Sequence, residues 1–142
     1  LRPSSLDQLG LIPALDMLCE DAAGRLGIAV NTQLAPVTLD KDAELTVYRL
    51  VQESLTNVQK YAKAHEVHVV LEQEGDTVRV SVQDDGRGFD IDSVPSGHHG
   101  LLGMRVRVES HAGQLNIRSN ARDGTRVEAE LPARETPNAA AA

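Results

Sequence analysis

The sequence predicts an α/β fold, a two-layer α/β sandwich in which a mixed, mostly antiparallel sheet carries about three helices on one face. Three stretches have the three- and four-residue apolar spacing of amphipathic helices, and several shorter runs alternate apolar and polar residues as half-buried strands do. These helical and strand-like stretches segregate along the chain instead of alternating regularly, which favours one sheet with its helices on one side.

The first part of the chain predicts one helix and one strand. Pro13 stands at a first-turn position, and Gly27 ends the helix that follows. The apolar stripe of this helix consists of Ala14, Leu15, Leu18, Ala22 and Leu26. Ile28 to Leu34 is a strand candidate, weakened by Pro36 close to its end. We therefore expect a helix that leads directly into a strand.

A longer helix is predicted from Leu45 to Ala62, with Asp40 or Asp42 as its cap. Its apolar stripe consists of Val47, Leu50, Val51, Leu55, Val58 and Ala62. A second stripe is centred roughly a quarter of a turn away and consists of Glu53, Asn57, Lys60 and Tyr61. Polar residues at the rim of a buried face are placed to line a cleft between helices. The alternative is that they are solvated surface residues.

A hairpin and a glycine-rich loop follow this helix. Alternation over 67–71, a Gly75-Asp76 turn and alternation over 77–82 predict two antiparallel strands. The loop Asp84-Asp85-Gly86-Arg87-Gly88-Phe89-Asp90 comes directly after the second strand. Its two glycines allow another molecule to approach the main chain closely. We interpret it as a ligand loop, with an ordinary Asp-Gly turn as the alternative.

The remainder of the chain predicts a mobile loop over 91–99, a helix from Gly100 to Ala112 and two closing strands. The strands are indicated by their alternating apolar residues, which are Leu115 and Ile117 in one and Val127, Ala129 and Leu131 in the other. Residues 1–10 are expected to be the remnant of an upstream linker or dimerisation helix region. Residues 11–132 are expected to form the ordered domain, and 133–142 a disordered tail.

Composition limits the classes of function. With 142 residues, 41% of them hydrophobic, the chain is long enough for one compact core and too short for two ordinary domains. A net charge of -7 and an aromatic content of 2% disfavour a nucleic acid as the main partner. The apolar runs are too short for a membrane helix. Cys19 stands alone, so no internal disulfide is expected; it suits a reducing cytoplasm and should pack as a small hydrophobe.

Four motifs together resemble the GHKL ATP-binding domains, which are the ATPase domains of type II topoisomerases, heat-shock chaperones, mismatch-repair proteins and sensor histidine kinases. They are Glu53-Ser54-Leu55-Thr56-Asn57-Val58-Gln59-Lys60-Tyr61 as the N box, Asp84-Asp85-Gly86-Arg87-Gly88-Phe89 as the G1 box, His99-Gly100-Leu101-Leu102-Gly103-Met104-Arg105 as the G2 box and Gly124-Thr125 as the last box. Within this superfamily, the motif sequences are most similar to those of sensor histidine kinases of the nitrate/nitrite-sensor subfamily. The segments Leu1-Arg2-Pro3 and Gly103-Met104-Arg105 carry that similarity.

The resemblance implies a role for the residues of each box. Asp84 matches the aspartate that accepts a hydrogen bond from the exocyclic amine of adenine, where guanine presents an oxygen and is rejected. Asn57 matches the Mg²⁺ ligand, since magnesium prefers hard oxygens and needs few protein ligands beside phosphate. Glu53 matches the acid that orients or deprotonates the attacking nucleophile. Asp85 fills a variable position and is expected to be solvated.

Phosphate recognition is implied for Lys60 and for the glycines that begin the next helix, whose free N–H groups suit anions. The expected ATP-binding residues are Asn57, Lys60, Tyr61, Asp84, Gly86, Gly88, Gly100, Leu101, Gly103 and Thr125, with Glu53 and Asn57 catalytic and Asn57 the Mg²⁺ ligand. His98 replaces a glycine of the fuller G2 box, which puts the conformation of the lid in question. His98-His99 could also be half of a metal site, but no cluster with ligand spacing accompanies it.

The resemblance implies that residues 11–132 are the catalytic, ATP-binding domain of a histidine kinase, with ATP and Mg²⁺ as cofactors. Its partners would be the kinase's own upstream dimerisation and histidine-phosphotransfer domain and a response regulator, in a kinase that forms a homodimer. We expect a cytoplasmic domain, monomeric as this piece, of a protein associated with the bacterial inner membrane. The alternatives are an anti-sigma-type serine kinase, an ATPase, or a degenerate non-catalytic nucleotide-binding module.

Overall fold

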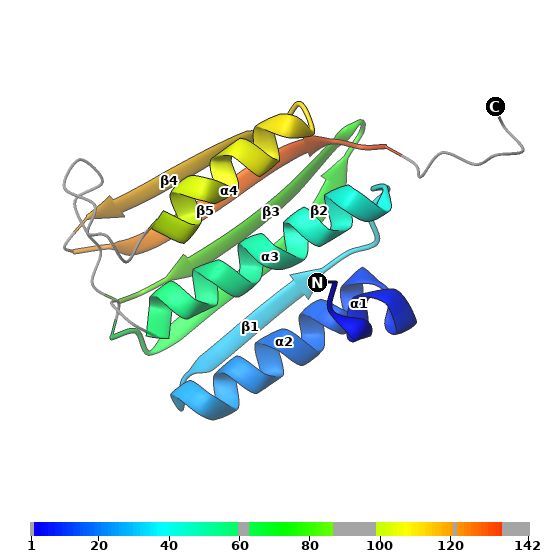
Figure 1. The fold of residues 1–142 in the computed structure, drawn as a ribbon. Coiled ribbons are helices and arrows are strands. Elements are labelled where there is room, and N and C mark those ends of the chain that lie inside the picture. The colour runs from blue at the N-terminus through cyan, green and yellow to red at the C-terminus, as the bar shows by residue number, and fades with distance from the viewer. Residues whose placement is uncertain (1, 60–62, 87–98, 121, 135–142) are drawn as a thin grey trace, which may run out of the picture.

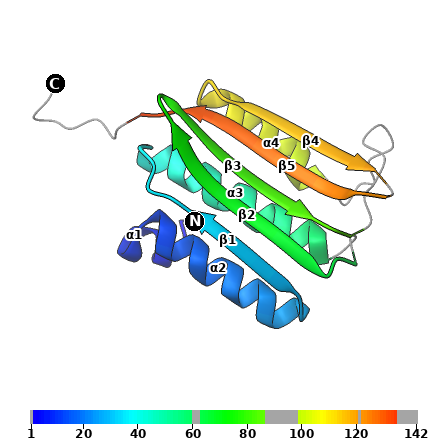
Figure 2. The same ribbon diagram turned by 180° about the vertical axis from the view of Figure 1, so that it is seen from behind.

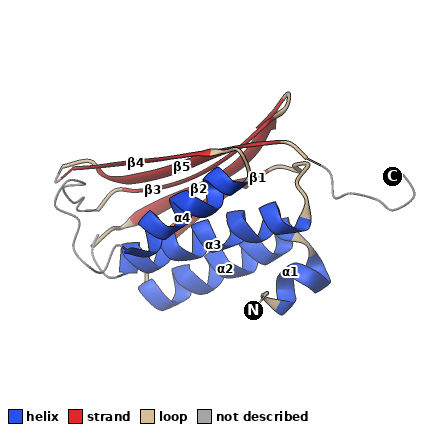
Figure 3. Ribbon diagram, turned by 45° about the horizontal axis from the view of Figure 1, so that its top comes forward, coloured by secondary structure: helices blue, strands red, loops and turns tan. Residues whose placement is uncertain are grey.

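Helices cover one face of a five-stranded sheet in the computed structural model of this chain, and the two layers are separate in Figure 1 and Figure 3. The structure describes residues 2–59, 63–86, 99–120 and 122–134. In chain order the elements are α1 (Ser4–Leu9), α2 (Leu11–Leu26), β1 (Ala29–Leu34), α3 (Lys41–Asn57), β2 (Glu66–Glu74), β3 (Thr77–Asp84), α4 (His99–Ser110), β4 (Gln114–Asn120) and β5 (Gly124–Pro132).

The sheet has the strand order β1-β2-β3-β5-β4. The strands β1 and β2 are parallel, with Ala29 opposite Glu66, because the long helix α3 connects them as a crossover. All other neighbouring pairs are antiparallel, and the tight turn at Gly75 joins β2 to β3. The predicted two-layer α/β sandwich with a mixed, mostly antiparallel sheet is therefore confirmed.

The helix boundaries follow local chemistry. Gly27 has φ 66° and ends α2 as predicted, since glycine adopts this left-handed conformation without strain. Asp40 caps α3 by accepting a hydrogen bond from the Ala43 N–H at 2.8 Å, so α3 begins at Lys41, earlier than the predicted Leu45. At its other end, α3 is regular to Asn57 instead of Ala62, and residues 60–62 lie outside the described residues.

The hydrophobic core lies between the helices and one face of the sheet. The alternating valines of the central strands are buried, namely Val67, Val69, Val78, Val80, Val82 and Val127. The opposite face, seen from behind in Figure 2, is polar. On that face Arg79 of β3 pairs with Glu130 of β5 at 3.1 Å and with Glu72 of β2 at 3.4 Å. The apolar alternation thus sets which face of the sheet the helices cover.

Residues near both ends of the described chain contact the rest of the domain. Leu6 of α1 is only 4% exposed and joins the core. Beyond β5, the N–H groups of Ala133 and Arg134 bond to the carbonyls of Asp76 and Thr38, whereas residues 135–142 lie outside the described residues. That residues 1–10 derive from a dimerisation region stays a prediction.

Cys19 is packed in the core, as predicted for a small hydrophobe. Burial, with a smaller contribution from the charge of Asp16, raises the pKa of its thiol to about 12. Within the described ranges, none of the helices combines the length and the apolar composition that crossing a bilayer requires.

Candidate functional site

The predicted site residues that the structure describes lie at one end of the domain. Figure 1 shows α3 and β3 ending there, and α4 and β5 beginning there. Asn57 is the last residue of α3, Asp84 the last residue of β3, and Gly100 lies in the first turn of α4. Segments that are far apart in the sequence therefore bring their motif residues to a common edge of the sandwich.

Asp84 is a buried carboxylate, 5% exposed, held by the main chain. Its Oδ1 accepts hydrogen bonds from the N–H of Gly86 at 2.9 Å and from the N–H of Thr125 at 3.3 Å. Burial raises the pKa of Asp84, the two N–H groups oppose that rise, and the charge of Asp85 adds to it. Both bonds go to the same oxygen, so Oδ2 is the atom with which Asp84 can accept a hydrogen bond from a ligand.

Gly124 allows the start of β5 to approach Asp84. Its φ is 79°, and a Cβ at this position would overlap the Asp84 carbonyl oxygen and lie 2.8 Å from Oδ1. Because the obstructing atoms include main chain, a side chain at Gly124 would displace Asp84. Gly124 stands in the last of the four motifs, but of this motif only Thr125 was expected to bind the nucleotide. Its signal was the pairing with Thr125, which the structure places on the same carboxylate.

Asp85 is exposed, in keeping with the expectation of a solvated side chain, and it is also bonded to the main chain at the start of β2. Its Oδ1 accepts hydrogen bonds from the N–H groups of His65 at 2.8 Å and Glu66 at 3.0 Å, and its own N–H donates to the Glu66 carbonyl at 3.2 Å. The N–H donors of Glu66 and His65 lower the pKa of the Asp85 carboxyl. The two neighbouring acids therefore face opposite environments, one desolvated and one stabilised as an anion.

Asn57 carries the least satisfied polar side chain in the described part of the chain. It is 8% exposed, and neither Oδ1 nor Nδ2 has a hydrogen-bond partner among the described residues. Ser54, on the same helix, bonds instead to the Leu50 carbonyl at 2.7 Å. A buried amide without partners costs stability, so such groups usually serve a ligand. The carboxamide oxygen of Asn57 fits a magnesium ion, which binds hard neutral or anionic oxygens.

Glu53 lies one turn before Asn57 and contacts the first turn of α4. A Cβ on Gly100 would overlap the Glu53 carboxylate, so the two cannot coexist unless the acid moves. Gly103 has open space around it, although both glycines belong to the same motif. The carboxylate of Glu53 is thus placed at the positive end of the α4 dipole.

The remaining predicted residues differ in what the structure says of them. Leu101 is 1% exposed and packs in the core, so only its main chain can meet a ligand. Gly103 is the fifth residue of α4, so its N–H falls within the helical hydrogen-bond ladder, whereas Gly100 lies in the first turn, where N–H groups have no carbonyl partner within the helix itself. The predictions that lie outside the described residues are those for Lys60, Tyr61, Gly88 and the His98 lid position.

Two pairs of residues meet at this end of the domain. Asp84 bonds to the N–H of Thr125, and the Glu53 carboxylate lies against Gly100. Asn57 stands beside the second pair on α3 with an unpartnered amide. One buried carboxylate, one hard neutral oxygen and the start of α4 can together bind a ligand that has both a hydrogen-bond donor and an anionic group.

Comparison with known proteins supports this interpretation. Residues 42–135 match the family described as histidine kinase-, DNA gyrase B- and HSP90-like ATPases. Over 134 residues the chain is 38% identical to the signal transduction histidine-protein kinase/phosphatase DegS of Brevibacillus brevis. That alignment covers 93% of this chain and 35% of DegS, so the chain spans about a third of its relative's length.

Solved structures show the same fold. The histidine kinase domain of the Erythrobacter litoralis EL346 blue-light activated kinase superposes with a TM-score of 0.69 at 25% identity, covering 84% of this chain and 59% of the other. The mycobacterial sensor histidine kinase MprB superposes with a TM-score of 0.67 at 22% identity, covering 87% and 94%, a likeness of fold alone. Neither comparison favours the serine-kinase, ATPase or non-catalytic alternatives.

Proposed function

The chain belongs to the histidine kinase-, DNA gyrase B- and HSP90-like ATPase family, and from that premise we propose that it is the ATP-binding catalytic domain of a two-component sensor histidine kinase. The domain holds Mg·ATP and presents the γ-phosphate to a histidine on a separate dimerisation domain. The observation that carries the proposal is the buried, unpartnered amide of Asn57 at the same end of the domain as the buried carboxylate of Asp84.

Asp84 selects adenine. Its Oδ1 is held by two main-chain N–H groups, so its Oδ2 accepts the hydrogen bond from the exocyclic amine of the base. Guanine presents an acceptor at that position, which would leave a buried carboxylate facing an oxygen. Gly86, directly after this acid pair, gives the purine and its sugar room to approach the main chain.

Asn57 holds the metal and Glu53 directs the reaction. The Asn57 Oδ1 would be the oxygen ligand that this chain gives to Mg²⁺, and the bound ion would supply neutralisation of charge on the phosphates. The N–H of Gly100, in the first turn of α4, binds phosphate oxygens. Glu53, against that turn, orients the accepting histidine. The nitrogen of that histidine forms a bond to the γ-phosphorus while the bridging P–O bond breaks and ADP leaves. The nucleophile thus comes from the other domain, and this domain contributes positioning.

The partners follow from this role. The kinase's own dimerisation domain supplies the histidine within a homodimer, and a response regulator takes the phosphoryl group from it. We further place the kinase in the nitrate/nitrite-sensor-like subfamily, on the phrases Leu1-Arg2-Pro3 and Gly103-Met104-Arg105. The full-length protein resides at the bacterial inner membrane with this domain in the cytoplasm.

Calorimetric titration of the chain tests the proposal. ATP with Mg²⁺ should bind, GTP should bind far more weakly, and omission of Mg²⁺ should weaken ATP. Asn57→Asp should damage metal-dependent binding and Asp84→Asn should weaken adenine recognition. Two matched controls are Asn116→Asp, at an exposed position of β4, and Asp76→Asn, in the β2–β3 turn. Neither should change metal-dependent binding or adenine recognition.

Two results would contradict the proposal. One is that the Asn57 and Asp84 variants hold Mg·ATP as well as the parent chain does. The other is a phosphohistidine formed on this chain alone from labelled ATP, because the phosphate acceptor is assigned to another domain.

A further inference from the structure

Asp84 and Asp85 attach the end of β3 to two different strands. Asp84 reaches across to β5 through the Thr125 N–H at 3.3 Å. Asp85 reaches the other way, to the start of β2, through the N–H groups of His65 and Glu66 at 2.8 and 3.0 Å. The main chain is therefore tied on both sides at the residue where the glycine loop departs.

The strand start that Asp85 binds is itself fixed. The His65 carbonyl accepts a hydrogen bond from the Ala29 N–H of β1 at 3.1 Å. The Glu66 carboxylate accepts another from the Asn31 amide of the same strand. Asp85 thus attaches the loop to the parallel β1–β2 pair. Of this pair, β2 is the strand that follows Asn57 and the end of α3 in the chain.

We propose that Asp85 is a positioning residue for nucleotide binding. By fixing the origin of the glycine loop, it holds the Asp84 carboxylate and Gly86 at the place where the purine must be read. The inference rests on the proposed function. Ordering a binding group when the ligand arrives costs free energy and lowers the affinity. If Asp85 no longer holds Asp84 and Gly86 in place, the affinity therefore falls even though every ligand contact is kept.

This role requires an oxygen acceptor at residue 85 but not a negative charge. An asparagine Oδ1 can accept both N–H groups, although more weakly than a carboxylate does. Alanine offers no side-chain acceptor, so both bonds from the N–H groups of His65 and Glu66 are lost and only the main-chain bond from the N–H of residue 85 to the Glu66 carbonyl remains. The two variants therefore separate the hydrogen-bonding role from any effect of charge on the anionic nucleotide, since both remove the charge.

The test is calorimetric titration of Mg·ATP and Mg·ADP into the parent chain, Asp85→Asn, Asp85→Ala and Asp40→Ala. The temperature is one at which circular dichroism shows every variant folded. Asp40→Ala is the matched control, because it also removes a carboxylate bonded to a main-chain N–H. It lies at the opposite end of the 17-residue helix α3, about 25 Å from Asn57 at 1.5 Å per residue.

Asp85→Ala should weaken the binding of both nucleotides about tenfold and by the same factor, because Asp84 and Gly86 are proposed to meet the purine, which ATP and ADP share. Asp85→Asn should stay within about threefold of the parent, and Asp40→Ala should bind like the parent. If Asp85→Ala loses stability but binds Mg·ATP like the parent, or if Asp85→Asn is as impaired as Asp85→Ala, the inference is overturned. Failure of the parent chain to bind either nucleotide would instead overturn the proposed function, and this inference with it.

Discussion

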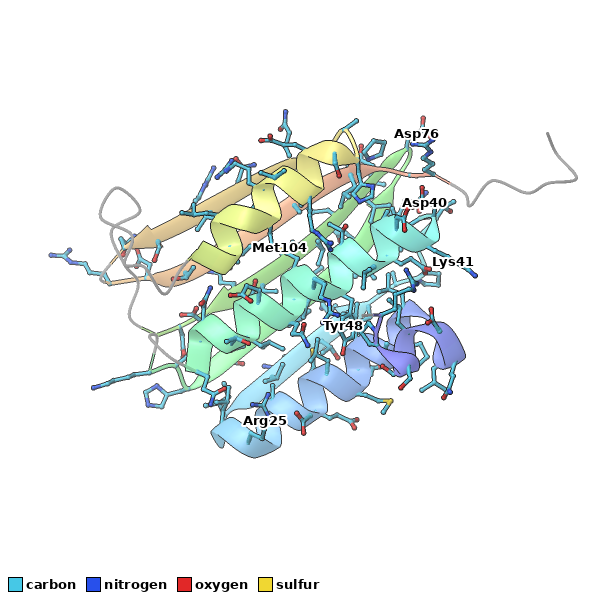
Figure 4. All side chains as sticks on the ribbon, viewed as in Figure 1. Arg25, Asp40, Lys41, Tyr48, Asp76 and Met104 are labelled. Carbon is cyan, nitrogen blue, oxygen red and sulfur yellow. The ribbon has the colours of Figure 1, made fainter. Side chains whose placement is uncertain are left out.

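The polar groups at the two ends of α3 differ in whether they have hydrogen-bond partners among the described residues. At the first end, Asp40 caps the helix, and Arg2 of the N-terminal segment donates to the Lys41 carbonyl at 3.2 Å. Figure 4 shows Asp40 and Lys41 at this end. One turn on, Thr46 bonds to His111 at the end of α4 at 2.9 Å. At the last end, Asn57 is buried with no partner for its amide among the described residues.

This difference indicates where the helix gains stability and where it serves a ligand. The Asp40 cap and the bonds to Arg2 and His111 anchor the first end, which allows the last end to hold an amide that no described residue satisfies. Because α3 is one continuous helix, fixing its first end also fixes the positions of Asn57 and Glu53 near its last end. Substitutions along α3 should reveal the contrast.

The largest effect is expected at Asn57. Asn57→Leu replaces an unsatisfied amide by an apolar group of similar size, so the nucleotide-free chain should gain about 1–3 kcal/mol in the free energy of unfolding. Binding of Mg·ATP should be lost. Chemical denaturation and calorimetry measure the two effects. Ser54→Ala is the control: its hydroxyl is bonded, so its removal should give no gain. A loss of stability in Asn57→Leu would show that this amide is satisfied after all.

Asp40→Ala should show the reverse pattern. Loss of the cap should lower the free energy of unfolding by about 1 kcal/mol, while the affinity for Mg·ATP in the folded state stays unchanged. Denaturation in urea measures the first quantity and titration the second. If the affinity falls with the stability, the two ends of α3 do not have separate roles.

The two glycines of α4 should differ by up to about 1 kcal/mol, the usual gain in helix propensity on changing glycine to alanine. Gly103→Ala should gain this stability because its surroundings are open. Gly100→Ala should gain less because Glu53 must move aside. In a Glu53→Ala background the two gains should become equal by thermal denaturation. Equal gains in the parent chain would mean that Gly100 does not confine Glu53.

The smallest effect concerns pH. Because the pKa of Asp84 is raised in the folded state, this residue contributes its full stabilisation only at pH values below 3.8, the ordinary pKa of an aspartate. The stabilisation is lost as the pH rises through the folded-state pKa. The lowered pKa of Asp85 acts oppositely: its contribution is present above 3.8 and is lost as pH falls through the folded value. Relative to the parent, Asp84→Asn should therefore gain stability toward neutral pH, and Asp85→Asn should lose it. Denaturation curves at several pH values that show the same trend for both variants would contradict this assignment.

The sequence predicted the sheet and the helices because their periodicity reports burial directly. It also predicted that Asn57 and Asp84 belong to one site, since both stand in recognisable motifs. It could not predict what Asp85 does, because its partners lie about twenty residues earlier and are main-chain groups. Nor could it separate Gly100 from Gly103, since the difference is the position of Glu53 on another helix.

The helix boundaries show the same limit. Asp40 and Asp42 were equal candidates for the cap of α3, and only the main-chain geometry selects Asp40. The unpartnered state of the Asn57 amide is likewise a property of the whole fold, because it depends on which neighbours surround the end of α3.

The central claim is most directly tested by a crystal structure of the chain with Mg²⁺ and a non-hydrolysable ATP analogue. We predict that the Asn57 Oδ1 coordinates the metal and that the Asp84 Oδ2 accepts a hydrogen bond from the adenine amine. A nucleotide bound elsewhere on the domain, or a metal ion that Asn57 does not contact, would contradict the account.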